Sequence, residues 1–192
     1  MCRVSWARPR RLNARFFPLP PGRAALWICA AAFALRLAFV LTVPPERLAI
    51  GDQLEYDAIA DNLVAGNGFA TQPGIPTANR APLYPMTMAA VYKTVGRSPR
   101  AVLVLQAVLG AATVLLLLWL LRETVENEAA AQIGAWLFAV HPVGIVYCGR
   151  LFAETLSTFL LALSMLLLAR HLCRGKALEA VLAGLVMGLA TL

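Results

Sequence analysis

Long apolar stretches, separated by shorter polar ones, make up most of the chain. A transmembrane helix needs about 20 mainly apolar residues to cross about 30 Å of hydrocarbon. Four stretches reach that length, and a fifth is interpreted as a span cut short. Because no water reaches that depth, each stretch must be helical to satisfy its own backbone. The pattern therefore indicates an all-α polytopic membrane protein with spans at about 24–43, 101–121, 129–148, 151–169 and 177–192.

One long polar excursion, the external loop 44–100, separates the first predicted span from the second. Within it, apolar residues recur at helical spacing over 52–65 and again over 82–95, which predicts two amphipathic helices. The intervening residues 68–79 are rich in Gly, Pro, Thr and Asn and predict a loop. Both helices are too short to span, so we expect them to lie along the outer membrane surface.

Three features mark the spans near their outer ends. His141 followed by Pro142 predicts a kink in the third span, with a structural rather than a metal-binding histidine. Only Gly149 and Arg150 separate the third span from the fourth, so we expect these two spans to form a helical hairpin. Arg36 lies within the first span and is expected to be structural, reaching outward to pair with an acid.

The composition supports a membrane protein. Hydrophobic residues make up 60% of the chain and the mean hydropathy is +0.70, whereas soluble domains contain about 45–50% apolar residues. The four cysteines lie far apart without a CxxC pair, so neither a metal finger nor a disulfide framework is indicated. The sequence contains no P-loop, GxGxxG, HExxH or GxSxG motif, which argues against a soluble nucleotide-binding fold.

The net charge of +7 comes mainly from the first 23 residues, which hold six arginines and no acid. A basic arm can bind nucleic acid, but beside a membrane span its plainer interpretation is topological, and we expect no nucleic-acid partner. Since Lys and Arg near span ends are retained in the cytoplasm, residues 1–23 are predicted to form a basic cytoplasmic arm. The loop 44–100 then lies outside, and the loops 122–128 and 170–176 inside, in a multi-pass protein of the cell inner (cytoplasmic) membrane.

Four acids lie on the first predicted amphipathic helix. At about 100° per residue, Asp52 and Glu55 share a face with apolar residues, whereas Asp57 and Asp61 fall on the opposite face and are expected to meet water. An apolar setting raises the pKa of a carboxyl toward the range of a general base. The alternative is a helix N-cap, since Asp52 with Glu55 three residues later also fits a capping arrangement.

Glu154 lies inside the fourth predicted span, near its outer end. Ionisable residues within spans are costly and are functional candidates, and topology places Glu154 on the same membrane side as Asp52. The alternative is a helix–helix contact in which Glu154 pairs with Arg150. A mostly polar stripe continues the same helical face with Ser157, Thr158, Leu161 and Ser164.

Arg80 lies just before the second amphipathic helix. Helix N-termini favour anions, so Arg80 with this terminus is a candidate phosphate site. The alternative is an ordinary surface arginine.

The order and spacing of several short motifs resemble the N-terminal part of bacterial GT-C glycosyltransferases. The resemblance is to the family-39 group, which includes dolichyl-phosphate-mannose-protein mannosyltransferase-like enzymes and transferases of aminoarabinose and galacturonic acid. It covers roughly residues 24–192. The residues that carry it are Gly51-Asp52-x-x-Glu55-Tyr56, Asn62-Leu63-x-x-Gly66-x-Gly68-Phe69, Arg80-x-Pro82-Leu83-Tyr84-Pro85, Gln106, Glu154-Thr155-Leu156 and Gly184-x-x-x-Gly188-Leu189-Ala190.

The resemblance implies a GT-C-like transmembrane module over 24–192 and an inverting transfer of sugar. The donor would be a polyprenyl-phosphate sugar in the membrane, and the acceptor a lipid, glycan or protein at the outer face. Asp52 would act as general base or orient the acceptor, and Glu154 would be the second acid, holding the acceptor or a divalent cation. No cofactor beyond that cation is implied. The substrate-binding residues would be Glu55, Tyr56, Arg80, Tyr84 and Arg150, with the two arginines neutralising the leaving phosphate.

Length sets this chain apart from that group, whose members usually have more spans and often a C-terminal outer domain. One alternative is therefore a non-catalytic membrane remnant or assembly subunit that keeps the GT-C fold. A second is a small transporter in which Glu154 relays ions. Transporters typically show inverted repeats and charges at the membrane midplane. The sequence shows no such repeat, and its acids lie near the outer edge.

Overall fold

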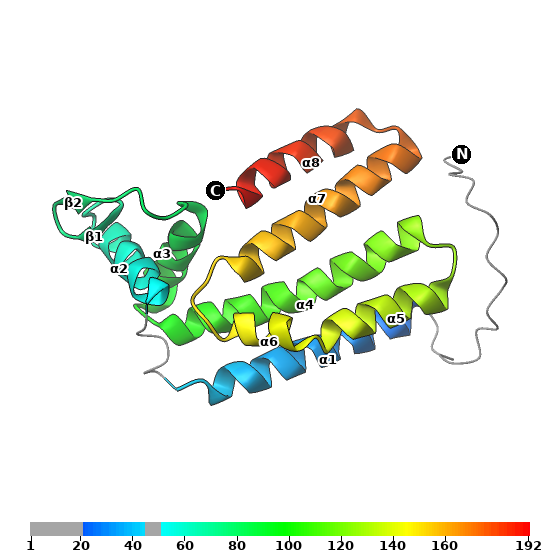
Figure 1. Ribbon diagram of the computed structural model, residues 1–192, viewed down its shortest axis with the longest axis horizontal. Helices are drawn as coiled ribbons and strands as arrows, with labels where there is room; N and C mark the ends of the chain where they lie inside the picture. The colour runs from blue at the N-terminus through cyan, green and yellow to red at the C-terminus, as the bar shows by residue number, and fades with distance from the viewer. Residues whose placement is uncertain (1–20, 45–50) are drawn as a thin grey trace.

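The computed structural model describes residues 21–44 and 51–192, which fold into a helical bundle with a small unit at one end (Figure 1). Pro21–Thr42 forms α1, which begins slightly before the predicted span. The remaining elements are α2 (Asp52–Val64), β1 (Ala70–Gln72), β2 (Ile75–Pro76), α3 (Leu83–Val95), α4 (Pro99–Thr124), α5 (Glu128–Ala139), α6 (Pro142–Cys148), α7 (Glu154–Arg174) and α8 (Ala177–Ala190).

Three of the described helices, α1, α4 and α7, are long and apolar enough to cross a membrane. The pair α5 and α6, bent by 48°, has the length and composition of a fourth, broken span or of a re-entrant loop, and α8 is a shorter apolar helix. The predicted fold class, an all-α polytopic membrane protein, is confirmed. So is the kink at His141-Pro142, where the chain breaks between α5 and α6. Pro142 has no N–H to continue the helix, and it starts α6 instead.

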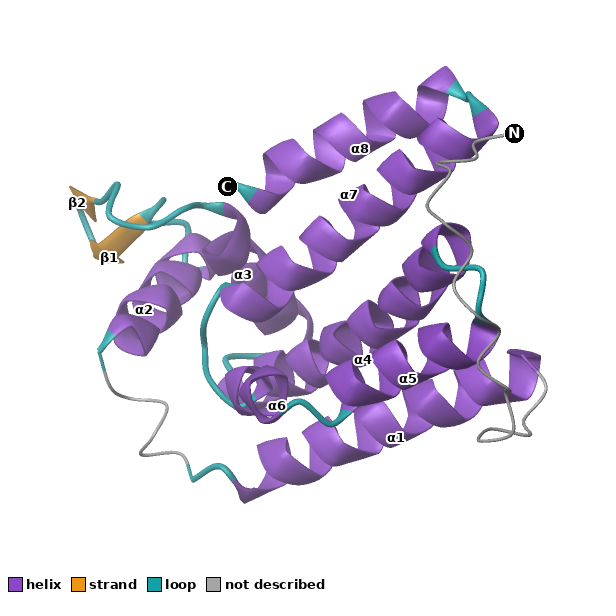
Figure 2. Cartoon of the chain, turned by 45° about the vertical axis from the view of Figure 1, so that its right-hand side comes forward, coloured by secondary structure: helices purple, strands orange, loops and turns teal. Residues whose placement is uncertain are grey.

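The bundle is centred on α4, which packs against α1, α5, α6 and α7. In two views α7 lies along α4 and α8 lies along α7 (Figures 1 and 2). The third and fourth spans were predicted to form a helical hairpin. That prediction is wrong, because α5 and α6 pack mainly on α4 and α1, whereas α7 packs mainly on α4 and α8. The residues 149–153 carry the chain from α6 to a helix that packs on α4 and α8, because α4 and α8 offer α7 its apolar partners.

Arg36 is almost fully buried, at 1% exposure, and its partners are backbone carbonyls rather than the predicted acid. Its Nη1 donates to the Ala139 carbonyl at 2.9 Å and to the Ala32 carbonyl at 3.1 Å, and its Nη2 donates to the Phe138 carbonyl at 3.4 Å. These carbonyls include the last of α5, which the break leaves without helical partners. Gly110 gives the guanidinium room, since a Cβ there would lie 2.7 Å from Arg36 Nε.

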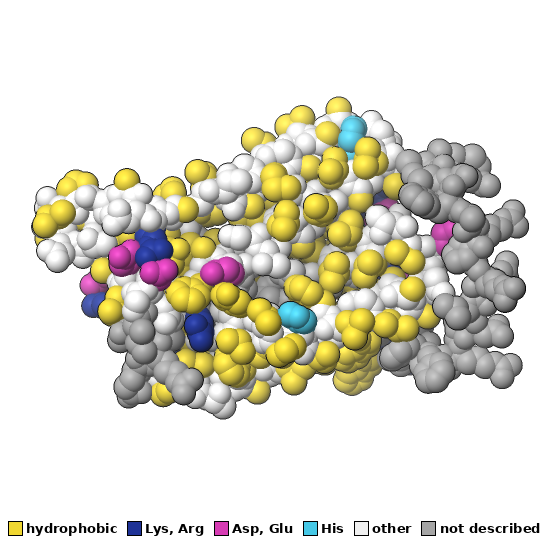
Figure 3. Space-filling model, viewed as in Figure 1, with side chains coloured by type: hydrophobic (Ala, Val, Ile, Leu, Met, Phe, Trp, Pro, Cys, Tyr) yellow, Lys and Arg dark blue, Asp and Glu magenta, His cyan; other side chains and the backbone are white. Residues whose placement is uncertain are grey.

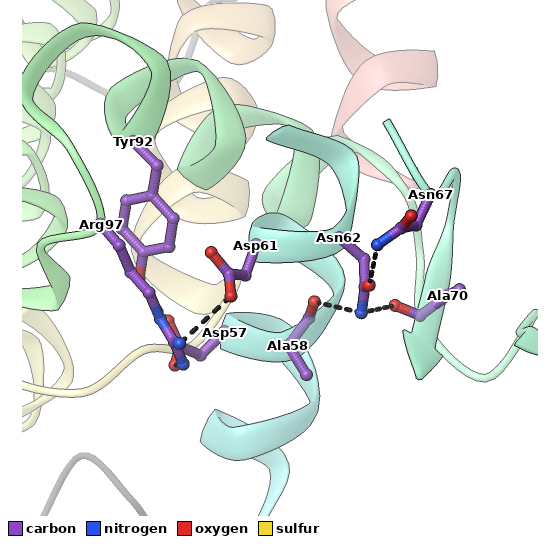
Figure 4. A network of polar contacts seen from close by, with 8 residues as sticks. All are labelled: Asp57, Ala58, Asp61, Asn62, Asn67, Ala70, Tyr92 and Arg97. Atoms are coloured by element: carbon purple, nitrogen blue, oxygen red, sulfur yellow. Dashed lines mark hydrogen bonds and ion pairs between the residues drawn. The ribbon is translucent and has the colours of Figure 1, made fainter. Parts of the chain in front are cut away.

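The two predicted amphipathic helices, α2 and α3, are present and pack against each other at one end of the bundle (Figure 1). The segment predicted as a loop contains a short antiparallel pair instead, in which Ala70 pairs with Pro76 and Gln72 with Ile75. Asn62 fixes this hairpin to α2, because its Nδ2 donates to the carbonyls of Ala58 and Ala70 at 3.0 Å (Figure 4).

Asp57 corrects the predicted division of the acids on α2. It was expected to face water, but it is 9% exposed and packs toward α3. The Tyr92 hydroxyl donates to it at 2.6 Å, and Arg97 pairs with both Asp57 and Asp61 (Figure 4). Burial, together with the hydrogen bond to Asp57, raises the pKa of Tyr92 and keeps its hydroxyl protonated as a donor.

We expect Asp57→Ala to lower the free energy of unfolding by about 1–3 kcal/mol, because the buried Tyr92 hydroxyl loses its acceptor. The matched control is Asp61→Ala on the same helix, which removes a half-exposed partner of Arg97 and should change stability by under about 0.5 kcal/mol. Denaturant unfolding of the whole chain in detergent measures both. Equal effects of the two changes would contradict the network.

The connections α4–α5 and α7–α8 lie at the end of the bundle opposite to α2 and α3 (Figure 1). There Arg122 pairs with Glu128 at 2.6 Å and Arg174 with Glu123 at 2.6 Å. The loops predicted on opposite membrane sides therefore lie at opposite ends of the bundle, while the orientation in the cell stays a prediction. The basic arm lies outside the described residues except for its last part, which includes the exposed Arg23 in α1.

Candidate active site

Asp52 and Glu55 meet Arg80 at the end of the bundle that carries α2 and α3. Arg80 Nη2 lies 2.6 Å from Asp52 Oδ1, and its Nε lies 2.7 Å from Glu55 Oε2. Asp52 is the first residue of α2, and the N-cap is Gly51, whose φ of 59° suits glycine. The N-cap role considered for Asp52 is therefore wrong, because its carboxylate binds a guanidinium and no side chain caps this helix.

Two tyrosines connect Arg80 to the inside of the bundle. The guanidinium carbon of Arg80 lies 5.2 Å from the ring centroid of Tyr56, a cation–π distance. Tyr56 packs edge-on against Tyr84, with 5.0 Å between ring centroids. Burial raises the pKa of Tyr56 although the charge of Arg80 opposes the shift, and the hydrogen bonds to Asp52 and Glu55 raise the pKa of Arg80. Tyr56 therefore stays a neutral phenol and Arg80 stays a cation near neutral pH.

Glu154 begins α7, on the same side of the bundle, and is exposed. It lines a cavity of about 330 Å³ together with Arg36, His141, Thr155 and Thr158. Its charge acts on both Tyr56 and Tyr84 by raising their pKa values, after the larger effect of burial. Glu154 thus lies within electrostatic range of Tyr56 and Tyr84, the two tyrosines beside Arg80.

The structural alternative for the α7 stripe is partly right. Ser164 Oγ donates to the Ala183 carbonyl of α8 at 2.8 Å, which is the expected kind of helix–helix contact. Among residues 21–44 and 51–192, however, no ion pair joins Glu154 to Arg150. Arg150 instead lies over the Phe152 ring, 5.9 Å from its centroid.

On the face shown in Figure 3, acidic and basic groups gather beside the small unit, and hydrophobic groups cover most of the bundle. The roles predicted for Asp52, Glu55, Tyr56, Arg80, Tyr84, Arg150 and Glu154 stay predictions. Among the described residues, no three His, Cys, Asp or Glu side chains converge as a metal site.

Two buried glutamines at this end were not among the predicted site residues. Gln106 on α4 contacts Tyr84 and the backbone of Arg150, and Gln53 on α2 contacts the backbone of Leu151. A polar residue within an apolar span is a functional candidate, and this criterion could have identified Gln106. Gln53 lies in a polar helix, where the same criterion does not apply.

A family model described as dolichyl-phosphate-mannose-protein mannosyltransferase matches residues 79–192, more than half of the chain. The match includes Arg80, Tyr84, Arg150 and Glu154, whereas Asp52 precedes it. No curated protein and no solved structure matches the chain. With its apolar helices and the matched residues together, the chain belongs to this family of GT-C membrane glycosyltransferases.

Proposed function

We propose that the protein transfers a sugar from a polyprenyl-phosphate donor to an acceptor at the outer face of the membrane, with inversion at the anomeric carbon. The observation that carries this proposal is the pairing of Asp52 and Glu55 with Arg80 at one end of the bundle. A transfer of this kind needs a carboxylate to take the acceptor's proton and a cation to balance the leaving phosphate. Here the carboxylates of Asp52 and Glu55 are in direct contact with the guanidinium of Arg80.

In the proposed reaction the acceptor oxygen or nitrogen attacks the anomeric carbon and its proton passes to the Asp52 carboxylate. The bond from the anomeric carbon to the phosphate oxygen breaks, and the electron pair stays on the phosphate. Arg80 neutralises that phosphate. Asp52 keeps a half-exposed side chain, so its carboxylate is open to an acceptor while Arg80 binds one edge. The donor phosphate competes with Asp52 and Glu55 for the guanidinium and so frees the base.

Glu154 has a different proposed role from Asp52. It lies at the edge of the cavity of about 330 Å³, which is lined mainly by apolar and hydroxyl-bearing residues. Because no ion pair occupies it within the described part of the chain, its carboxylate is available to hold hydroxyl or amine groups of the acceptor. Arg150, on the neighbouring connection, supplies a second cation for the phosphate.

The test uses the full chain in liposomes supplied with polyprenyl-phosphate mannose and, in parallel, with the aminoarabinose and galacturonic acid donors. We expect at least one donor to release polyprenyl phosphate in a protein-dependent way, and NMR recorded before mutarotation should show the released sugar first in the inverted configuration. Release to water reports the reaction even before the acceptor is known.

The matched control is Glu126→Gln, an exposed acid at the opposite end of the bundle, which should react like the wild type. Absence of protein-dependent release from all three donors would contradict the proposal and favour a non-catalytic member of the family.

A further inference from the structure

The connection between α6 and α7, residues 149–153, is fastened through its backbone by two buried glutamines. Gln106 from α4 is 1% exposed and Gln53 from α2 is 5% exposed. Gln106 Nε2 donates to the Arg150 carbonyl at 2.7 Å, and Gln53 Oε1 accepts from the Leu151 N–H at 2.9 Å. Two consecutive residues of one short connection are therefore held by side-chain amides from two different helices.

Gln106 also reaches the aromatic part of the site. Its Oε1 accepts from the Tyr84 hydroxyl at 3.3 Å. Burial raises the pKa of Tyr84 well above its ordinary value, so the hydroxyl stays protonated and donates. Tyr84 packs on Tyr56, which in turn lies under Arg80. The Gln106 amide thus links the Arg150 backbone to a continuous series of contacts. The series runs through Tyr84, Tyr56 and Arg80 and ends at the carboxylates of Asp52 and Glu55.

Simple anchoring of the connection does not need these amides. Leu151 is fully buried in an apolar cluster and already anchors the connection. The Gln106 amide lies within a span, where a polar group is costly unless it has a task. The residues at either end of the fastened segment, Arg150 and Glu154, are both members of the proposed site.

We infer that Gln106 and Gln53 are positioning residues for the transfer, holding the connection and Glu154 in a fixed place relative to Asp52 and Arg80. The inference rests on the proposed function. Neither glutamine touches the reacting atoms. They act through backbone groups, and a displacement of about 1 Å of the groups that they hold is enough to slow a reaction about a hundredfold.

Gln106→Met and Gln53→Met remove the amides and keep similar side-chain volumes. In the donor-release assay with the full chain, we expect kcat to fall at least about tenfold in each variant, and to fall by more than KM rises. Gln53→Glu retains the acceptor for the Leu151 N–H and should recover most of kcat. The matched control is Gln132→Met, another buried glutamine in a membrane helix, whose amide donates to Glu128 at the far end.

A second measurement does not depend on turnover. Hydrogen exchange of the Leu151 amide should be at least about tenfold faster in Gln53→Met than in wild type or Gln132→Met. Faster exchange with unchanged kcat in both variants would overturn the positioning role. Should the wild type release no donor phosphate, the proposed function fails, and the exchange result alone decides whether the amides hold the connection. Unchanged exchange overturns the inference in either case.

Discussion

Asp52→Asn is expected to slow sugar transfer by about a hundredfold to ten-thousandfold, the usual contribution of a general base. The amide is isosteric with the carboxylate and can still accept a hydrogen bond from Arg80, so the fold around the 2.6 Å contact should survive. It cannot take the proton of the attacking group. The loss should therefore appear mainly in kcat, which donor-release kinetics in liposomes measure.

The control for this change lies on the same helix. Asp61→Asn removes the same charge from a half-exposed position that pairs with Arg97, away from Arg80. It should transfer sugar at the wild-type rate, which would show that loss of an acid from α2 is not enough to inactivate the protein. Transfer that persists in Asp52→Asn would show that another group takes the proton, with Glu154 the next candidate.

Arg36→Met is expected to lower the free energy of unfolding by about 2–4 kcal/mol. The change leaves the Ala139 carbonyl without a donor where the bent span has no helical continuation, and it removes the second donor of the Phe138 carbonyl, which keeps the His141 N–H. Relief from burying a charge offsets only part of this loss, because the guanidinium donates to carbonyls of two helices. Denaturant titration in detergent micelles, followed by circular dichroism, measures the difference.

Arg23→Met provides the comparison, because Arg23 is an exposed arginine on the same helix. Its replacement should change stability by under about 0.5 kcal/mol. Equal stability of Arg36→Met and the wild type would mean that the α5 carbonyls find other donors, and that the arginine does not hold the break in place.

The apolar stretches and the positions of proline and glycine predicted the helices well. The apolar stretches are long, and Pro142 breaks the third span because its ring excludes a helical hydrogen bond. The short strands over 70–76 could not be predicted in this way. Their stability comes from pairing with each other and from Asn62, not from an alternating pattern.

Candidate site residues could be named from the sequence, but the contacts among them could not be predicted. A helical wheel gives the relative directions of Asp52 and Asp57, but it does not say which side α3 covers. Tertiary packing therefore reversed the expected burial of Asp57. Arg36 shows the same limit, since two of its three carbonyl partners lie about a hundred positions along the chain. Backbone acceptors leave no trace in side-chain patterns.

The pairing of one arginine with two carboxylates has a consequence for selectivity among lipids. Asp52, Glu55 and Arg80 together carry one net negative charge. Phospholipid phosphates, the commonest anions in the surrounding leaflet, are repelled by such a cluster, whereas a lone arginine at the membrane surface would attract them. An anionic lipid that binds through Nε and Nη2 of Arg80 has to displace Glu55 and Asp52, and further contacts through another part of the molecule would help it to do so. We therefore expect the acids to weaken the binding of bulk lipid at this cation and to favour a ligand that carries a second recognition group beside its phosphate.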